Sequence, residues 1–470
     1  MKLYELGIKA AREGLAKGEF SSVELTQAVI DRYHEKNGEI GAYLTFDEEA
    51  ALAKAKADPK AVPIAVKDLI NVKGQPCTCA SKILEGYVSP YDATVIERME
   101  AASFIPAGRV NMDEFAMGSS TENSALGKTR NPYDPGRVPG GSSGGSAAAV
   151  GGDLAIAALG TDTGGSIRQP ASFCNCVGVK PSYGRVSRYG VTAFASSLDQ
   201  VGPMTKSVED AAILLGALAG RDPRDGTTAA EPVPDYLKAL EGASMKGVRL
   251  GLAKEYLEVA GMDPEVKRLT DEAIKKCEAA GAELVEVSLP HTGYAMAVYY
   301  ILAPAEASAN LARFDGVRYG HRSAEAKDVL SLYMKSRAEG FGPEVKRRII
   351  MGTYVLSSGY YDAYYGRAQK VRTLITRDFT EAFAKVDALL TPCAPTPAFR
   401  FGENQDPLTM YLNDLYTIPS ALAGVCASSV PAGFTAGANP GLPVGVQFIC
   451  GAFEEAKLLR ISKAFEDLNK

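Results

Sequence analysis

Residues 140–146 read Gly-Gly-Ser-Ser-Gly-Gly-Ser, and residues 160–168 read Gly-Thr-Asp-Thr-Gly-Gly-Ser-Ile-Arg. A serine flanked by glycines can sit on a tight turn with its hydroxyl exposed, where neighbouring backbone N–H groups are free to hold an oxyanion. Ser142 and Ser166 occupy such positions, 24 residues apart. The two segments therefore indicate nucleophilic catalysis by serine.

A serine hydroxyl needs a base to take its proton, and the usual base is scarce here. The chain has three histidines, His34, His291 and His321, and none is near the glycine-rich segments in sequence. Lys67, which lies 75 residues before Ser142 in the run Ala-Val-Lys-Asp, is the natural candidate. A Ser-Lys pair is a known variant of the catalytic triad.

Residues 140–144 also allow two other interpretations. A Gly/Ser stretch is often a flexible linker, although the small apolar residues 147–150 that follow are typical of the start of a packed helix. The same residues match G-x-S-x-G, the nucleophile elbow of α/β-hydrolases. That fold needs an acid and then a histidine, for which Asp199 with His291 or His321 is available. An esterase that uses Ser142 is thus an alternative.

The second glycine-rich segment is more distinctive. Residues 154–159 read as a short buried strand of small apolar residues that runs directly into the segment. Consecutive N–H groups at 163–166 can form a concave anion-binding nest. Asp162 and Arg168 flank the nest, and we expect them to form an ion pair that shapes the turn.

Taken together, these residues resemble the amidase-signature family, over nearly the whole chain and most specifically from Lys67 to about Gly202. The resemblance implies an α/β fold consisting of a single domain, residues 1–470, with a mixed central sheet flanked by helices and a catalytic core at about 60–215. It implies a Ser-Ser-Lys triad and an oxyanion hole, with Ser166 as nucleophile, Ser142 as proton relay after a cis peptide bond, Lys67 as base, and the N–H groups of Thr163, Gly164, Gly165 and Ser166 around the oxyanion.

Three further segments, residues 112–122, 166–171 and 183–190, are similar to the glutamine-hydrolysing branch of that family. The resemblance implies a glutaminase that supplies ammonia to a partner for the amidation of Glu-tRNA(Gln), Asp-tRNA(Asn) or both. It implies two other subunits, a small tethering one and a larger one that binds tRNA and uses ATP and Mg²⁺. This chain then carries no cofactor and meets tRNA only through the complex. The alternatives are a stand-alone amidase of small amides and a non-catalytic scaffold subunit.

Glutamine carries an α-carboxylate and an α-ammonium beside its reactive amide, so a selective pocket needs a cation and an acid. Arginine suits a carboxylate because its planar fork bonds it bidentately. The resemblance points to Arg347 for the carboxylate, with Arg348 as the alternative, and to Asp414 for the ammonium. It also implies that Met117, Ser119 and Tyr300 line the pocket, with Tyr299 as the alternative to Tyr300.

Composition agrees with a cytoplasmic enzyme. The net charge is −5, from 51 basic and 56 acidic side chains, whereas a nucleic-acid-binding surface is normally basic. Eight scattered cysteines include two C-x-C pairs and no C-x-x-C, so free buried thiols in a reducing compartment are favoured over a metal site. We see no signal peptide at the N-terminus and no run of about 18 apolar residues that could cross a membrane.

Strands and helices alternate along the chain. We expect strands at 62–66, 248–252, 283–287 and 444–450, with Lys67 directly after the first. Capping signals at Ser21, Ser207 and Asp263 predict that three amphipathic helices begin there, and a final helix runs through Phe465. The strand at 248–252, the helix after Asp263 and the strand at 283–287 form a β-α-β unit. Residues 221–246 read as a surface connection.

Overall fold

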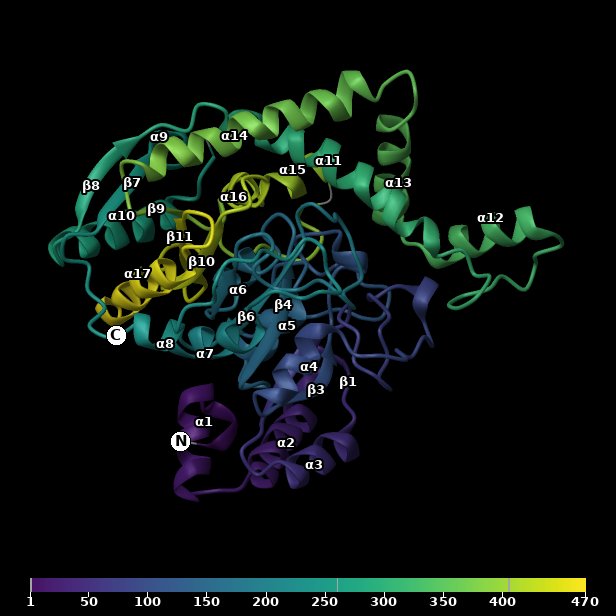
Figure 1. The fold of residues 1–470 in the computed structure, drawn as a ribbon, viewed down its shortest axis with the longest axis horizontal. Coiled ribbons are helices and arrows are strands. Elements are labelled where there is room, and N and C mark those ends of the chain that lie inside the picture. Colours follow the sequence, from purple (N-terminus) through teal and green to yellow (C-terminus); the bar gives the residue numbers. More distant parts are fainter. Residues whose placement is uncertain (1, 260, 405) are drawn as a thin grey trace.

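An eleven-stranded mixed sheet runs through the middle of the molecule (Figure 1). The structure, a computed structural model, describes residues 2–259, 261–404 and 406–470. In spatial order the strands are β1 (Tyr43–Thr45), β3 (Phe104–Val110), β2 (Val62–Lys67), β4 (Ala157–Asp162), β6 (Gln200–Thr205), β5 (Val177–Lys180), β10 (Cys426–Phe434), β11 (Pro443–Cys450), β9 (Ala388–Pro392), β7 (Arg249–Ala253) and β8 (Glu283–Val287).

Parallel and antiparallel pairs alternate in blocks across this sheet. The neighbours of β2, which are β3 and β4, both run parallel to it. The strands from β4 through β6, β5, β10 and β11 to β9 pair antiparallel, and β9, β7 and β8 are again parallel. This mixed sheet with flanking helices confirms the α/β fold class expected from the sequence.

Helices cover the sheet and extend beyond it (Figure 1). They are α1 (Ile8–Lys17), α2 (Ser22–Ile40), α3 (Glu48–Ala57), α4 (Thr94–Ala101), α5 (Gly144–Gly151), α6 (Arg168–Phe173), α7 (Val208–Leu218), α8 (Tyr236–Ala239), α9 (Lys254–Leu257), α10 (Pro264–Ala279), α11 (Ala295–Asn310), α12 (Val329–Gly340), α13 (Pro343–Val355), α14 (Arg367–Phe383), α15 (Pro407–Leu412), α16 (Ile418–Leu422) and α17 (Glu455–Leu468).

The predicted capping residues begin helices as expected. Ser21 accepts a hydrogen bond from the Glu24 N–H at the start of α2, with the reciprocal contact of a capping box, and Ser207 caps α7 through the Asp210 N–H. Asp263 caps α10, which connects β7 to the parallel strand β8. The predicted β-α-β unit is therefore confirmed.

The strand expected at 154–159 forms later, as β4 at Ala157–Asp162. The cause lies in the end of α5, where the N–H groups of Leu154 and Ala155 both donate to the Ala149 carbonyl oxygen. These residues therefore complete the helix terminus and are unavailable to the sheet. The shift carries β4 through Thr161 and Asp162, directly up to the second glycine-rich segment.

Close packing of α5 brings the first glycine-rich segment against the sheet. The helix packs on β4 and β2, and all its residues from Gly144 to Val150 are buried. A Cβ on Gly145 would lie 2.3 Å from the Asn111 carbonyl oxygen, so only glycine permits this approach. The segment is thus packed core rather than a flexible linker.

Residues 295–383 form a helical segment for which the sequence patterns predicted no secondary structure. Within it α11 packs against both α13 and α14. Figure 1 shows α12 and α13, in green, extending to the right of the sheet, away from the N-terminal helices. Residues 221–246 are largely exposed and contain the short helix α8.

Candidate active site

Lys67 ends strand β2, and its side chain is fully buried. Its nitrogen Nζ lies 2.8 Å from Ser142 Oγ, 2.7 Å from Ser143 Oγ and 2.9 Å from Thr161 Oγ1. Burial disfavours the charged ammonium and lowers the pKa of Lys67 to about 7. The lysine can therefore be neutral near pH 7, as a general base must be.

Ser143 fixes the direction of these hydrogen bonds. Its hydroxyl donates to the Thr161 carbonyl oxygen at 3.1 Å, so its single hydrogen is committed and it can only accept from Lys67. A neutral amine has two hydrogens and one lone pair. With one hydrogen directed to Ser143 and the other to Thr161 Oγ1, the lone pair is left to accept the hydroxyl hydrogen of Ser142. The geometry thus suits proton transfer from Ser142 to Lys67.

Ser142 is held on both sides by backbone contacts. The Gly141–Ser142 peptide bond is cis, as the resemblance implies. The Ser142 carbonyl oxygen accepts from the Asp113 N–H at 3.2 Å, and the Gly141 N–H donates to Gln169 Oε1 at 3.0 Å. These contacts fix the Ser142 hydroxyl beside Lys67.

Ser166 lies between β4 and α6, tied to the first segment by a hydrogen bond from the Ser143 N–H to its carbonyl oxygen. Its side chain is 8% exposed, and its hydroxyl has no hydrogen-bond partner among the described residues. In the same part of the chain, none of the four N–H groups at 163–166 donates to a protein acceptor. An unpaired hydroxyl beside unpaired N–H groups is the arrangement expected of a nucleophile next to an oxyanion hole.

Packing holds these N–H groups in place. A Cβ on Gly164 would lie 2.8 Å from the Tyr299 ring, and one on Gly165, whose φ is +152°, would lie 2.2 Å from Thr417 Oγ1. Thr417 Oγ1 also donates to the Gly164 carbonyl oxygen at 2.6 Å. The loop is therefore rigidly preorganised.

The ion pair expected between Asp162 and Arg168 is present and fully buried, with Arg168 Nη2 2.9 Å from Asp162 Oδ1. Burial alone would raise the pKa of Asp162, but Arg168 overrides it and the pKa lies below its usual value. Arg168 also donates to Gln447 of β11 and to Ser420 of α16. The pair thus anchors the turn that carries Ser166 to distant elements.

The hydrolase interpretation based on Asp199 is not supported by the geometry. Asp199 accepts from Thr163 Oγ1 at 2.7 Å and from two backbone N–H groups, and no histidine touches it in the part of the chain that is described. His291 pairs with Asp378 and His321 with Glu339. Ser142 meets Lys67 instead, so Asp199 supports the oxyanion loop.

A cavity of about 260 Å³ opens beside Arg348 of α13. The Arg348 side chain is buried, with its guanidinium 5.4 Å from the Tyr300 ring centre and 5.5 Å from that of Tyr411. Its Nε donates to Glu344, whereas its two Nη atoms bond no described residue. Two free, parallel donors are what a bidentate carboxylate requires.

Asp414 lies beside the oxyanion loop. Its Oδ2 accepts from Ser119 Oγ at 2.5 Å, and a Cβ on Gly165 would lie 3.3 Å from its Oδ1. Burial raises the pKa of Asp414 to about 7. A carboxylate here can pair with an ammonium group, which would in turn favour its ionised form.

The predicted pocket residues separate into two groups. Ser119 and Tyr300 contact Asp414 and Arg348 respectively, whereas the Met117 side chain is fully buried in the main hydrophobic core. Arg347 lies at the cavity mouth with a side chain that is 46% exposed, ion-paired to Glu344. Of the two arginines that the sequence leaves open, the geometry favours Arg348. Of the two tyrosines, it places Tyr300 beside that arginine.

Sequence reasoning missed Ser143, Thr161, Glu344 and Tyr411. Ser143 has a signal, because it directly follows Ser142 in the glycine-rich run. Glu344 precedes Arg348 by four residues, the spacing of neighbours on one helix face, but that pattern is common on any helix. Tyr411 precedes Asp414 by three residues, but the sequence does not show that its ring reaches Arg348 on α13.

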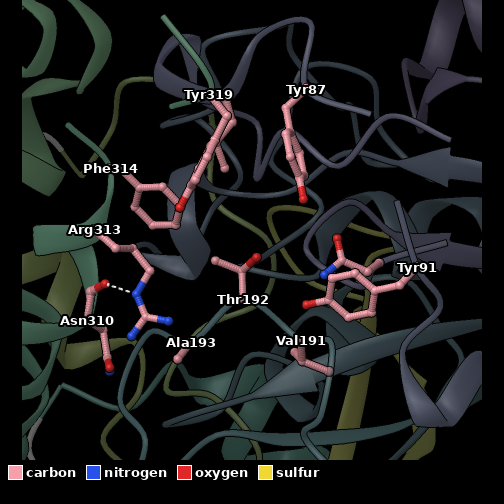
Figure 2. A pocket seen from close by; sticks show the side chains of 11 residues that line it. Tyr87, Tyr91, Val191, Thr192, Ala193, Asn310, Arg313, Phe314 and Tyr319 are labelled. Carbon is pink, nitrogen blue, oxygen red and sulfur yellow. Dashed lines mark hydrogen bonds between the residues drawn. The ribbon is translucent and has the colours of Figure 1, made fainter. Parts of the chain in front are cut away.

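A second pocket, of about 160 Å³, opens elsewhere on the surface. Figure 2 shows Arg313 on one side of it and Tyr91 on the other, with Thr192 between them. It contains none of the triad or substrate residues predicted from the sequence. The cavity beside Arg348 is lined by both candidate arginines, Arg347 and Arg348, and by none of the triad residues, so it is a candidate for the amino-acid head of a substrate rather than for its reacting amide.

All eight cysteines are free and buried, as expected. Within residues 2–259, 261–404 and 406–470, no group of three or more His, Cys, Asp or Glu side chains is placed to hold a metal ion. No helix in these ranges is long and apolar enough to span a membrane.

Comparison with known proteins places these features in a family. The model of the family described as Amidase matches residues 24–459. The A subunit of glutamyl-tRNA(Gln) amidotransferase from Desulfatibacillum aliphaticivorans is 55% identical, and the match covers 99% of this chain and 98% of that protein. The protein of the same name from Geotalea daltonii is 56% identical with the same coverage.

A solved structure agrees with these sequence relatives. The crystal structure of the A subunit of glutamyl-tRNA(Gln) amidotransferase from Thermotoga maritima superposes with a TM-score of 0.82 at 42% identity. The match covers 99% of this chain and 95% of that one. The similarity therefore extends over the whole fold and includes both glycine-rich segments.

Proposed function

This chain belongs to the amidase-signature family, and we propose that it is the glutaminase subunit of a glutamyl-tRNA(Gln) amidotransferase. The observation that carries the proposal is the combination of a Ser-Ser-Lys arrangement with Arg348 and Asp414. A free guanidinium and a buried carboxylate match the two charged groups of the amino-acid head of glutamine. An ordinary small amide has neither group.

The proposed chemistry begins with Ser166. Its Oγ attacks the side-chain amide carbon of glutamine, while its proton passes to Ser142 and the hydroxyl proton of Ser142 passes to Lys67. The amide oxygen, now negatively charged, is held by the N–H groups at 163–166. Lys67 then returns a proton through Ser142 to the amide nitrogen, the C–N bond breaks, and ammonia leaves.

A glutamyl ester on Ser166 remains after this step. Water attacks the ester carbon while its proton passes through Ser142 to Lys67. The same proton then returns through Ser142 to Ser166 Oγ as the C–O bond breaks, which releases glutamate and restores the free hydroxyl. In our proposal, the ammonia passes to a partner subunit, which uses it to amidate the aminoacyl group on tRNA. That partner binds tRNA and activates its glutamyl or aspartyl group with ATP and Mg²⁺, while a small third subunit tethers the two.

An apolar surface on the projecting helices α12 and α13 supports a partnership. Val329, Leu330 and Met334 of α12 are 80%, 70% and 61% exposed, and Ile350 of α13 is 70% exposed. Contiguous exposed apolar side chains mark interaction sites, and Val329, Leu330 and Met334 lie within two turns of one helix. We propose that a partner subunit covers them. Eight buried free thiols suit a reducing compartment, so we place the complex in the cytoplasm.

Trapping the acyl group tests the proposal. The chain is mixed with glutamine or a glutamine analogue that acylates slowly, quenched, digested and analysed by mass spectrometry. We expect the glutamyl adduct on Ser166, and transfer to Glu-tRNA(Gln) only when the partner subunits, ATP and Mg²⁺ are present. If the isolated chain instead hydrolyses amides that lack the amino-acid head as fast as it hydrolyses glutamine, it is a stand-alone amidase.

A further inference from the structure

We infer that Glu344 is a positioning residue that sets the spacing between Arg348 and Asp414, and so determines selectivity for the amino-acid head of glutamine. The inference rests on the proposed function, because it concerns the same substrate. Glu344 lies in the first turn of α13 and is 9% exposed. Its carboxylate is the only described side chain that bonds both Arg348 and the segment carrying Asp414.

The first contact orients the guanidinium. Glu344 Oε1 accepts from Arg348 Nε at 2.8 Å. The remaining neighbours of this guanidinium are the ring faces of Phe194, Tyr300 and Tyr411, at 5.4–5.6 Å. Attraction to ring faces holds a cation but leaves its in-plane rotation free, whereas a hydrogen bond to Nε fixes it. Because Nε is occupied, the two Nη atoms remain for a substrate carboxylate.

The second contact reaches the other half of the pocket. The same Oε1 accepts from the Tyr411 hydroxyl at 3.0 Å, and the Tyr411 ring stacks on Tyr300 with centres 3.8 Å apart. The Tyr411 carbonyl oxygen accepts from the Asp414 N–H at 3.2 Å. One carboxylate oxygen thus connects the cation on α13 to the acid that follows α15.

The position of Glu344 suits a negative charge. It lies near the N-terminus of the thirteen-residue helix α13, where the exposed N–H groups of the first turn stabilise an anion. Its other oxygen pairs with Arg347, whose exposed side chain can leave for solvent. Lys346, on the same helix, donates to the Ala338 carbonyl oxygen and does not bond Glu344. Lys346→Ala therefore removes a charge from α13 while leaving the Oε1 contacts intact, and it serves as the matched control.

Three variants of the amidotransferase complex provide the test: Glu344→Ala, Glu344→Gln and Tyr411→Phe. Each is assayed with glutamine, with butyramide, which lacks the amino-acid head, and with ammonia as nitrogen donor for transfer. Because Glu344→Ala removes a charge-assisted bond that acts alike on bound substrate and transition state, we expect the KM for glutamine to rise about 10- to 100-fold with kcat little changed.

The other expected results separate positioning from folding. Butyramide hydrolysis and ammonia-driven transfer stay at wild-type levels in Glu344→Ala, and Lys346→Ala resembles wild type throughout. Glu344→Gln keeps an oxygen acceptor and recovers part of the affinity. Tyr411→Phe raises the KM less than Glu344→Ala, and the double variant is less impaired than the product of the two single effects because both changes break the same connection.

Several results would overturn the inference. An unchanged KM for glutamine in Glu344→Ala refutes it, and so does an equal loss with glutamine and butyramide, which means that Glu344 only supports the fold. If Glu344→Ala does not fold, the KM of Glu344→Gln and Tyr411→Phe decides, and wild-type values in both refute it. A wild-type complex that does not prefer glutamine to butyramide refutes the proposed function instead.

Discussion

Lowering the pH from 8 to 6 should impair this enzyme in two separable ways. Burial lowers the pKa of Lys67 to about 7, so its neutral form, which can accept a proton, predominates above pH 7 and is lost below it. Burial also raises the pKa of Asp414 to about 7, so the carboxylate that pairs with an α-ammonium is likewise present above pH 7 and lost below it. Both groups therefore act in the same direction.

The expected loss of activity is larger for kcat/KM than for kcat. For a group with a pKa near 7, the fraction of molecules in the active protonation state falls from about nine-tenths at pH 8 to about one-tenth at pH 6, a roughly tenfold loss. In the free enzyme, Lys67 must be neutral and Asp414 must be ionised, so kcat/KM should fall about 100-fold. Once glutamine is bound, its ammonium lowers the pKa of Asp414, so kcat should fall only about tenfold and follow Lys67.

The assay is initial-rate glutamine hydrolysis by the assembled complex across this range, with ammonia-driven transfer as a control for the stability of the partner subunits. A plot of log kcat/KM against pH should approach a slope of 2 at the acid end, and Asp414→Asn should reduce that slope to 1. A kcat that does not change between pH 8 and pH 6 would show that Lys67 is not the base.

Four further substitutions should be informative. Ser166→Ala should abolish glutamine hydrolysis, because the neighbouring hydroxyls of Thr417 and Thr163 are already bonded to the Gly164 carbonyl oxygen and to Asp199 and cannot replace it. Ser142→Ala should be severe but incomplete because water can relay a proton. Acyl trapping by mass spectrometry measures both. Lys67→Arg should be almost inactive despite keeping its charge, since a guanidinium does not deprotonate in proteins, and wild-type rates in that variant would contradict a role as base. Arg348→Ala should raise the KM for glutamine about 100-fold or more while leaving ammonia-driven transfer intact, and equal losses in both assays would show a general defect.

Local signals explain how much of the catalytic centre was predictable. Ser142 and Ser166 lie in glycine-rich runs whose chemistry is readable from the residues themselves, and Lys67 follows a short apolar strand. Their meeting depends on β2 and β4 being adjacent parallel strands, which the sequence does not state but the family resemblance implies. The arrangement within a single turn follows from neighbouring residues, whereas the order of strands in a sheet depends on the whole chain.

The pocket was harder to predict for the same reason. Arg347 and Arg348 are neighbours in sequence, and which one faces the cavity depends on how α13 is rotated against α11 and the Tyr411 segment. Met117 illustrates the opposite difficulty, because an apolar residue beside a functional motif is equally suited to the core, where the structure places it. The boundary of β4 shifted because the end of α5 competes for Leu154 and Ala155.

The division of the site between two regions of the chain bears on how such enzymes diversify. Every group that would take part in bond making, from Lys67 to Ser166, comes from the first half, whereas Tyr300, Arg348 and Asp414 come from later elements that lie outside it. Substitutions in the later elements can therefore exchange one amide substrate for another without disturbing the reacting atoms. Directed evolution toward new amides should accordingly accumulate its changes between residues 295 and 415, and leave the two glycine-rich segments untouched.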